Sequence, residues 1–368
     1  MNTILGDYYY SGIKYNLSIY KNDSNIFDKL DEFIRIHQGQ TILIFISYDL
    51  KNDIEALTSD NKDFINFPII RCIVPRRISS ANEFNFNKKI KNSPISFKPE
   101  IDRSKYISIV NKIKSHIQKG DIYETNFCYN WSSNSKIHNP FLIYKKLEEL
   151  TDAPYKLYAE IDNHVIMSAS PELFLKKEGN KLISKPIKGT SKRDEEADID
   201  KKLAENLEID PKERTENIMI VDLVRNDLSR IAVKNSVSVE ELCKVYTFKN
   251  IHQMISKVSC HIDESIGFSE ILKSTFPMGS MTGVPKIKAM ELMDNYEISK
   301  RGLYSGSVGI IKPNGDFDLN VIIRTFMYNK INDYISFKVG SAITINSDPE
   351  KEYDETLTKA DALIKACC

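Results

Sequence analysis

Pairs of extended segments joined by tight turns recur along this chain, and they most constrain its fold. Extended runs flank Asp162-Asn163, the stretch 178–180 and, nearer the C-terminal end, the stretch 313–315. Two runs joined by two or three turn-forming residues fold back as antiparallel hairpins. Helical patterns separate these hairpins and cover residues 106–119, 194–228, 285–296 and 349–365. We therefore predict an α/β (α+β) fold in which helices cover the faces of antiparallel sheet.

The first hundred residues carry weaker signals. A helical pattern covers residues 26–37, and an apolar strand covers residues 41–48. Residues 75–104 are rich in Arg, Lys, Asn and Ser and have weak periodicity, which is typical of a boundary or crossing segment. We therefore predict a small N-terminal region followed by a larger one, with the division near residue 100.

Composition excludes several classes of protein. The 51 basic residues balance the 51 acidic ones, so no field of one sign attracts nucleic acid or an anionic membrane. The longest apolar runs, such as residues 42–46, are far shorter than the ~20 residues of a membrane-spanning helix. The six cysteines are scattered without a C-x-x-C pair, and the first residues lack the pattern of a secretory signal. We expect a cytoplasmic protein that binds neither nucleic acid nor membrane.

A lysine followed at once by glycine ends one of the predicted strands, in Pro186-Ile187-Lys188-Gly189-Thr190. Glycine lets a ligand or another backbone segment come close, so this lysine would lie at the rim of the sheet. A lysine can act as a nucleophile once burial or nearby cations lower its pKa from about 10.4. A solvated loop lysine has the same spacing, so the motif alone leaves both interpretations open.

Two pairs of glutamates lie three residues apart on predicted helices. Glu213 and Glu216 form one pair, and Glu352 and Glu355 form the other in the first turns of the last helix. A spacing of three places both carboxylates of a pair on one helix face. Each pair alone is typical of a solvated face, whereas four converging carboxylates would suit Mg²⁺.

A glycine-rich turn precedes the helix predicted over residues 285–296. The stretch 279–286 reads GSMTGVPK and so lacks the G-K-[ST] ending of a nucleotide-binding phosphate loop. Free amides at the start of a helix can bind an anion such as a carboxylate. A plain helix start with suitable turn residues accounts for the same letters, so this motif too stays open.

Taken together, seven collinear blocks resemble the chorismate-utilising enzymes, and among them the aminodeoxychorismate synthases most closely. The resemblance covers roughly residues 104–366. The blocks are GDIYETNFCYNW (120–131), SASPELFLKKEGNKLISKPIKGT (168–190), KERTENIMIVDLVRNDL (212–228), FPMGSMTGVPKIKAMELMD (276–294), RGLYSGSVGII (301–311), DFDLNVIIRTF (316–326) and VGSAITINSDPEKEYDETLTKA (339–360). Each block is weak evidence, but seven in this order are strong evidence.

The resemblance implies a fold of two stacked antiparallel sheets with helices on their outer faces and the active site in a cleft between them. It implies that residues 1–100 are a short N-terminal region contributing to the same sandwich. Residues 101–368 would then form the chorismate-binding catalytic domain. The implied substrate is chorismate, and the implied cofactor is Mg²⁺.

The resemblance also implies roles for individual residues. Glu216 and Glu352 match the family's metal ligands, with Glu213 and Glu355 beside them acting through water. Two further residues, Tyr304 and Arg324, match the pair that holds the enolpyruvyl carboxylate of chorismate, and a guanidinium fork suits that contact. The remaining matches are the substrate contacts Thr190, Gly340 and Lys359, and His252 beside the reacting ring.

Three further positions bear on the reaction itself. Lys188 stands where anthranilate synthases have alanine, and it matches the aminodeoxychorismate synthase lysine that attacks ring C2 while the C4 hydroxyl leaves. Glu172 matches the acid that protonates this hydroxyl, after which ammonia enters at C4 and expels the lysine. A nucleophilic Lys188 should have a lowered pKa. Glu124 stands where water-adding relatives have lysine and amine-adding relatives commonly have glutamine, so its role is unassigned.

The leading interpretation is therefore aminodeoxychorismate synthase component I, which makes 4-amino-4-deoxychorismate for 4-aminobenzoate and folate synthesis. Anthranilate synthase component I and a non-catalytic chorismate-binding relative are the alternatives. The chain has no G-x-C-x-G context for glutamine hydrolysis. We therefore expect its ammonia to come from a separate glutamine amidotransferase subunit.

Overall fold

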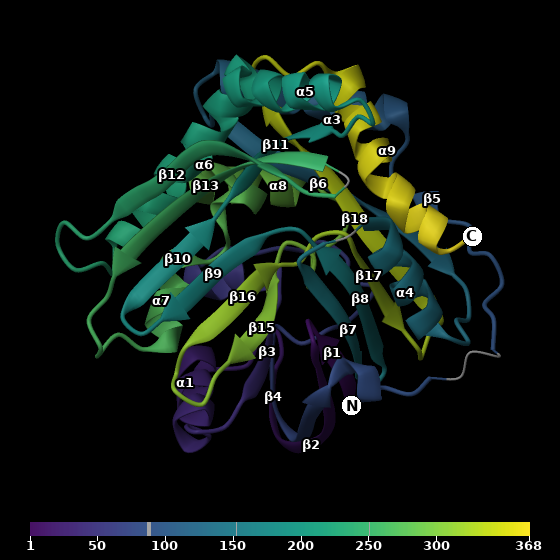
Figure 1. Cartoon of the computed structure of the whole chain (residues 1–368), viewed down its shortest axis with the longest axis vertical. Coiled ribbons are helices and arrows are strands. Elements are labelled where there is room, and N and C mark those ends of the chain that lie inside the picture. Colours follow the sequence, from purple (N-terminus) through teal and green to yellow (C-terminus); the bar gives the residue numbers. More distant parts are fainter. Residues whose placement is uncertain (87–89, 152, 250) are drawn as a thin grey trace.

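Antiparallel sheet dominates the computed structural model, which describes residues 1–86, 90–151, 153–249 and 251–368. Within these residues every ladder between named strands is antiparallel. Figure 1 shows the strands as two layers that splay apart, with helices on their outer sides. This arrangement confirms the predicted fold class.

The strands of the described residues are β1 (Asn2–Leu5), β2 (Tyr8–Ile19), β3 (Ile42–Ile46), β4 (Ile70–Ser80), β5 (Lys98–Pro99), β6 (Glu124–Asn134), β7 (Tyr155–Ile161), β8 (His164–Ser170), β9 (Leu173–Glu178), β10 (Lys181–Lys185), β11 (Ile187–Lys192), β12 (Ser238–Thr247), β13 (Ile251–His261), β14 (Gly283–Val284), β15 (Ser307–Ile311), β16 (Phe317–Val321), β17 (Thr325–Asn329) and β18 (Tyr334–Thr344). The three predicted hairpin turns connect β7 to β8, β9 to β10 and β15 to β16.

The α-helices of the described residues are α1 (Ile26–Ile36), α2 (Lys51–Ile54), α3 (Arg103–Gln118), α4 (Pro140–Thr151), α5 (Ala197–Ile209), α6 (Pro211–Ser229), α7 (Phe268–Thr275), α8 (Lys286–Tyr296) and α9 (Pro349–Ala366). Short 3₁₀ turns cover Tyr48–Leu50, Ala81–Glu83 and Gly279–Met281. None of the helices in the described residues is long and apolar enough to cross a bilayer.

Hydrogen bonds between strands join the two layers into one continuous sheet. The first layer, which we call the β6 half, runs β6–β18–β17–β8–β7. The second, the β13 half, runs β3–β15–β16–β9–β10–β13, and β11 and β12 also pair with β13. The N-terminal strands join the halves, because β1 pairs with β7 and β2, and β4 pairs with β2 and β3.

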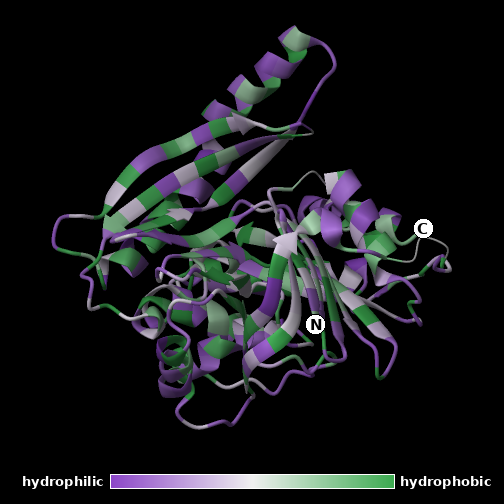
Figure 2. Ribbon diagram, turned by 60° about the horizontal axis from the view of Figure 1, so that its bottom comes forward, coloured by the Kyte–Doolittle hydropathy of each residue, from purple (hydrophilic) through white to green (hydrophobic). Residues whose placement is uncertain are grey.

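Hydrophobic cores lie between the halves and beneath the helices on both sides. The central cluster takes side chains from both halves, among them Phe45 of β3, Val308 of β15, Leu157 of β7 and Met327 of β17. A second cluster lies under α3, α4 and α9, and a third lies under α1, α6 and α7. Hydrophilic and hydrophobic residues alternate along many strands in Figure 2, as expected when successive side chains point to opposite faces.

Local sequence signals explain where the helices begin. In α9 the Asp348 side chain accepts from the Glu350 amide and Pro349 occupies the first turn, so the predicted helix 349–365 is confirmed within one residue. The helical pattern predicted over residues 194–228 is confirmed as two helices, α5 and α6, which meet at Asp210. Pro211 cannot donate an amide to α5, and Asp210 caps α6 through the amides of Lys212 and Glu213.

The predicted boundary segment 75–104 is partly sheet. Its first residues belong to β4, which pairs with β2 over Ile70–Ser80, so the weak periodicity there concealed a long strand. Residues 87–89 of the segment lie outside the described part. The predicted helix over residues 106–119 corresponds to α3, and Gly120 beyond it takes the left-handed backbone conformation typical of a helix end.

Candidate active site

A buried ion pair joins the two halves of the sheet. Lys188 lies on β11 of the β13 half, and Glu124 begins β6. Nζ of Lys188 donates a hydrogen bond to Oε1 of Glu124 over 2.7 Å. The side chains are only 11% and 2% exposed. Lys188 is therefore not the solvated loop lysine that its spacing allowed.

Acidic neighbours hold Lys188 as an ammonium ion. Burial alone would lower its pKa, but the carboxyl groups of Glu124, Glu216 and Glu172 outweigh that effect and raise the pKa above its ordinary value. The expectation of a lowered pKa is therefore wrong for this structure, because several carboxyl groups surround one amine. Nucleophilic attack by Lys188 requires a group that first removes its proton.

Glu172 lies in the link between β8 and β9 and is 5% exposed. Burial raises its pKa to about 7, although the Ser280 hydroxyl, Lys188 and the Ile187 amide act in the opposite direction. A carboxyl group with this pKa is partly protonated at neutral pH, which suits a general acid. The same contacts place Glu172 beside Lys188.

The four predicted metal ligands lie on two helices that meet around Lys212. Glu213 and Glu216 are on α6, and Glu352 and Glu355 are on α9. Nζ of Lys212 lies 3.5 Å from Oε1 of Glu352 and 3.9 Å from Oε1 of Glu216. The structure thus brings both helices to one place, with a lysine among their carboxylates.

The donor chemistry of this cluster fits a hard cation. Oε1 of Glu216 is buried and accepts no hydrogen bond within the described residues. Burial raises the pKa of Glu213, and it raises that of Glu216 to about 7, as expected of carboxyl groups short of positive charge. In the described part of the chain, however, no three His, Cys, Asp or Glu side chains are close enough to hold an ion. The Mg²⁺ site stays a prediction that requires the side chains to close around the ion.

Arg324 offers an unpaired positive charge. It occupies the turn between β16 and β17 with a φ of 50°, a left-handed conformation that is strained for a side chain of this size. Burial lowers the pKa of its guanidinium, and no acidic partner within the described residues offsets this. A half-buried cation without a partner carboxylate suits an anionic ligand.

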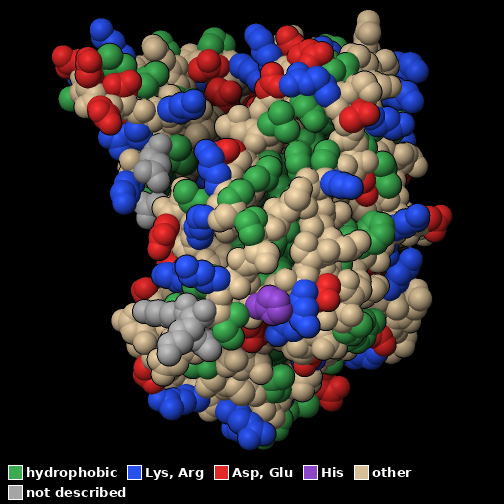
Figure 3. Space-filling model, turned by 90° about the vertical axis from the view of Figure 1, so that its right-hand side faces the viewer, with side chains coloured by type: hydrophobic (Ala, Val, Ile, Leu, Met, Phe, Trp, Pro, Cys, Tyr) green, Lys and Arg blue, Asp and Glu red, His purple; other side chains and the backbone are tan. Residues whose placement is uncertain are grey.

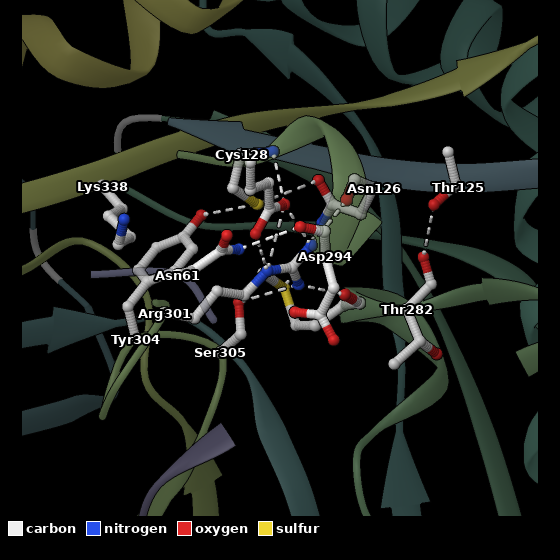
Figure 4. Close-up of polar contacts among 12 residues, drawn as sticks. Asn61, Thr125, Asn126, Cys128, Thr282, Asp294, Arg301, Tyr304, Ser305 and Lys338 are labelled. Carbon is white, nitrogen blue, oxygen red and sulfur yellow. Dashed lines mark hydrogen bonds and ion pairs between the residues drawn. The ribbon is translucent and has the colours of Figure 1, made fainter. Parts of the chain in front are cut away.

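Tyr304, the second residue predicted to hold the enolpyruvyl carboxylate, is part of a buried network centred on Arg301. Its hydroxyl lies 3.8 Å from Sγ of Cys128, as Figure 4 shows. Arg301 donates to both carboxylate oxygens of Glu297 and to the carbonyl oxygens of Met281 and Asn126. The guanidinium therefore fixes the 3₁₀ turn at Gly279–Met281 against β6.

Sequence reasoning missed this role of Arg301. Arg301 and Glu297 are four residues apart, a spacing that is ordinarily read as a solvated pair, yet their side chains are 1% and 6% exposed. A cavity borders the same network and is lined by Arg301, Tyr304, Lys338 and Asn130, but not by Lys188 or Glu172. It is thus separate from the Lys188 site.

Three predicted substrate contacts lie on strands or helices next to these groups. Nζ of Lys359 donates to the carbonyl oxygen of Gly340 over 2.9 Å and pairs with Glu355 at 2.6 Å. A Cβ at Gly340 would lie 2.6 Å from Sγ of Cys128, so only glycine fits there. Thr190 follows Lys188 by two residues on β11 and is exposed. Their substrate contacts stay predictions.

His252 lies on the side of β13 that α5 covers. Its Nε2 lies 2.9 Å from Oδ1 of Asp200, and its Nδ1 lies 2.9 Å from Oγ1 of Thr247. Arg193 and His252 together hold the pKa of Asp200 well below its usual range. Within the described residues these contacts tie His252 to α5 rather than to Lys188, so its place beside the substrate ring stays a prediction.

Residues 5–365 match the family described as chorismate binding enzyme. The chain belongs to the chorismate-binding enzyme family. On the side drawn in Figure 3, Lys and Arg side chains are interspersed with Asp and Glu.

Curated relatives from this family carry two different names. Anthranilate synthase component 1 of Aquifex aeolicus is 33% identical over 344 residues, which are 93% of this chain and 68% of that protein. Aminodeoxychorismate synthase component 1 of Bacillus subtilis is 34% identical over 271 residues, 74% of this chain and 57% of that protein. Chloroplastic aminodeoxychorismate synthase of Arabidopsis thaliana is 38% identical over 284 residues, 75% of this chain and 30% of that protein.

A solved structure confirms the fold of this chorismate-binding enzyme. Anthranilate synthase component I of Streptococcus pneumoniae superposes with a TM-score of 0.84 at 24% identity, covering 99% of this chain and 92% of that one. At this identity the likeness establishes the fold alone. The similar identities to differently named relatives leave the amination product to be argued from the site.

Proposed function

We propose that this chain is an aminodeoxychorismate synthase component I that converts chorismate and ammonia to 4-amino-4-deoxychorismate. The observation that carries the proposal is the burial of Lys188 between the two halves, with Glu124 and Glu172 beside it. The anthranilate synthases, by the resemblance described above, have alanine at this position. A buried lysine is costly unless it is paired, so its retention here favours chemistry that needs an amine.

The proposed reaction assigns a bond or a proton to each group. Neutral Lys188 attacks ring C2, and the C4 hydroxyl leaves as water with the proton of Glu172. Ammonia then forms a bond to C4 as the bond between Lys188 and C2 breaks and its electron pair returns to the amine. Glu172 takes a proton from the new C4 ammonium group and is restored as an acid.

Substrate binding is proposed to use the positive groups of the site. The unpaired guanidinium of Arg324 would hold the enolpyruvyl carboxylate in a bidentate contact, with Tyr304 nearby. Thr190, the Gly340 backbone and Lys359 would complete the pocket. Mg²⁺ held by Glu216 and Glu352, with Glu213 and Glu355 alongside, would supply positive charge to the ring carboxylate.

The proposed ammonia source is a separate glutamine amidotransferase subunit, because the chain lacks a cysteine in a G-x-C-x-G context. We further propose a cytoplasmic location and a single catalytic unit in which residues 1–100 support residues 101–368. Purified chain supplied with chorismate and Mg²⁺ should use ammonia and fail to use glutamine. Efficient use of glutamine by the chain alone would contradict the proposed partner.

Product identity tests the activity. Anthranilate fluoresces as soon as it forms, whereas aminodeoxychorismate yields 4-aminobenzoate only after a lyase is added. We expect 4-aminobenzoate in the coupled assay with wild type and none with Lys188→Ala. The matched control is Lys185→Ala, which replaces an exposed lysine at the end of β10. Wild-type formation of anthranilate would instead favour the second candidate, anthranilate synthase component I, which the Aquifex relative supports. No product under any of these conditions would favour a non-catalytic relative.

A further inference from the structure

We propose that Glu124 is the proton acceptor that converts Lys188 from an ammonium ion to the neutral nucleophile. The inference rests on the proposed function, in which Lys188 attacks the ring, and it adds a residue whose role the sequence leaves unassigned. Among the described residues, Glu124 is the one group that accepts a hydrogen bond from Nζ of Lys188. A proton can therefore move along a contact that already exists.

The backbone fixes Glu124 in this position. At the start of β6 it pairs with Val284 of β14 on one side and with Thr344 of β18 on the other. A Cβ at Gly283 would lie only 2.3 Å from the carbonyl oxygen of Glu124, so β14 can approach this closely only because residue 283 is glycine. Strands on both sides therefore hold the backbone of Glu124, and its carboxylate lies within hydrogen-bond reach of Lys188, as a proton acceptor must.

The second carboxylate oxygen of Glu124 has no competing partner. The side chain is 2% exposed, and Oε2 is buried without a hydrogen-bond partner in the described structure. The carboxylate therefore keeps acceptor capacity beyond its contact with Lys188. Glutamine at this position could accept the same hydrogen bond from Lys188 but could not accept its proton.

The other nearby carboxyl groups do not serve as acceptors of the Lys188 proton. Glu172 must hold a proton for the leaving hydroxyl, so it cannot also take one from Lys188 in the same step. Glu216, Glu213 and Glu355 act on Lys188 by charge from α6 and α9, with no hydrogen bond to its Nζ. These contacts therefore assign acceptance of the Lys188 proton to Glu124 and donation of a proton to the leaving hydroxyl to Glu172.

Each proton that is moved in the proposed reaction is returned within one catalytic cycle. The Lys188 ammonium ion transfers one proton to the Glu124 carboxylate, which leaves a neutral amine and a neutral acid. The amine bonds to C2 and becomes a secondary ammonium group, while Glu172 protonates the departing hydroxyl. When ammonia displaces Lys188 from the ring, Lys188 returns as a neutral amine and takes its proton back from Glu124.

The experiment measures formation of the adduct between Lys188 and the ring without ammonia, so that no displacement follows. Enzyme mixed with chorismate and Mg²⁺ is quenched over time and examined by mass spectrometry, from pH 6.5 to 9.5. Glu124→Gln removes proton acceptance and keeps the shape, and Glu124→Asp restores a carboxylate. The control is Asp227→Asn, which breaks another buried lysine–carboxylate pair, that of Lys286 and Asp227 at 2.6 Å, outside the site.

We expect Glu124→Gln to form the adduct about 100-fold or more slowly near pH 7.5. Loss of the Glu172 proton should slow adduct formation by wild type above pH 7. In Glu124→Gln this fall should be offset, because solvent removes the proton of Lys188, which Glu216, Glu213 and Glu355 still favour, more readily as pH rises. Glu124→Asp should recover part of the rate, and Asp227→Asn should lose stability without changing the pH profile. Chorismate affinity, measured by calorimetry, should be similar in wild type and Glu124→Gln.

Two results separate failure of this inference from failure of the proposed function. If wild type forms the adduct and Glu124→Gln forms it equally fast or faster at neutral pH, Glu124 is only a counter-ion and the inference is overturned. If wild type forms no adduct, and releases anthranilate once ammonia is added, the proposed function is overturned, and the role of Glu124 as acceptor for Lys188 is overturned with it.

Discussion

Nζ of Lys212 on α6 lies 3.5 Å from Oε1 of Glu352 on α9, and so joins the two helices that carry the predicted metal ligands. The same amine lies 3.9 Å from Oε1 of Glu216. Lys212 is 47% exposed at its side chain, so it can move away without breaking a core contact. Its position indicates that the carboxylate cluster attracts cations.

Mg²⁺ should stabilise the protein. An ion present at 100 times its dissociation constant for the folded chain adds about 2.7 kcal/mol, which corresponds to a rise in melting temperature of roughly 3–4 °C for a protein of this size. Thermal unfolding with Mg²⁺ and with excess chelator measures the rise, which Glu216→Gln should abolish. Glu350→Gln, an exposed glutamate of α9 paired with Arg103, should retain it. Identical melting curves in both buffers would remove support for the site.

Activity should fall above pH 7 because of Glu172. Its raised pKa of about 7 means that the protonated, active form dominates below that pH and is lost above it. With the concentration of free ammonia held constant, kcat/KM for chorismate should fall about tenfold per pH unit on the alkaline side. Glu172→Gln should have low activity, and its kcat/KM should not show this fall above pH 7. An unchanged alkaline limb in the variant would assign the titration to another group.

The same pKa makes a prediction about stability. The folded pKa of Glu172 exceeds the ordinary value of 4.5, so folding favours its protonated form. Its contribution is fully present below about pH 4.5 and is lost as pH rises towards 7, an effect of up to about 3 kcal/mol. Urea unfolding at pH 5 and pH 8 should therefore show Glu172→Gln gaining stability relative to wild type at the higher pH. A constant difference would contradict the assigned shift.

Replacing Arg324 should weaken substrate binding without destabilising the fold. Its guanidinium has no carboxylate partner in the described residues, so Arg324→Gln removes a half-buried charge that no carboxylate compensates. Loss of a charge-assisted contact should raise KM for chorismate about 10- to 100-fold. Arg225→Gln, which breaks an exposed pair on α6, is the matched control. A large drop in melting temperature would show that Arg324 is structural instead.

Glu297→Gln should be strongly destabilising. It would leave Arg301 buried without its counter-charge in the network of Figure 4, a change that typically costs about 3–5 kcal/mol. Chemical denaturation gives the difference, and Asp222→Asn, in the exposed pair with Arg225, should cost less than about 1 kcal/mol. Equal effects of the two substitutions would mean that the Arg301 network is solvated in solution.

Elements defined by local chemistry were predictable from the sequence. The start of α9 follows from Asp348-Pro349, and the end of α3 follows from Gly120, because capping depends on a few neighbouring residues. The break at Asp210-Pro211 carries the same kind of signal, but the helical pattern continues across it and hid the break. Strands β12 and β13 escaped prediction, since β12 exposes one face and is rich in charged residues.

The candidate site was only partly predictable, because it depends on contacts distant in sequence. Lys188 and the glutamate pairs were candidates from their motifs, and Glu172 was a candidate from the family resemblance. That Lys188 meets Glu124 depends on how β11 and β6 approach each other, which no local pattern encodes. The raised pKa of Lys188 and the burial of Arg301 follow from the same long-range packing.

The joining of both halves through β1, β2 and β4 limits how this protein can be shortened. In the described structure β7 has only β1 and β8 as neighbours, and β15 has only β3 and β16. Removing the first 80 or so residues would therefore strip one neighbour from each and create two long unpaired sheet edges. Such edges recruit strands from other molecules, so residues 101–368 expressed alone should aggregate. The N-terminal strands thus protect the rest of the sheet from self-association.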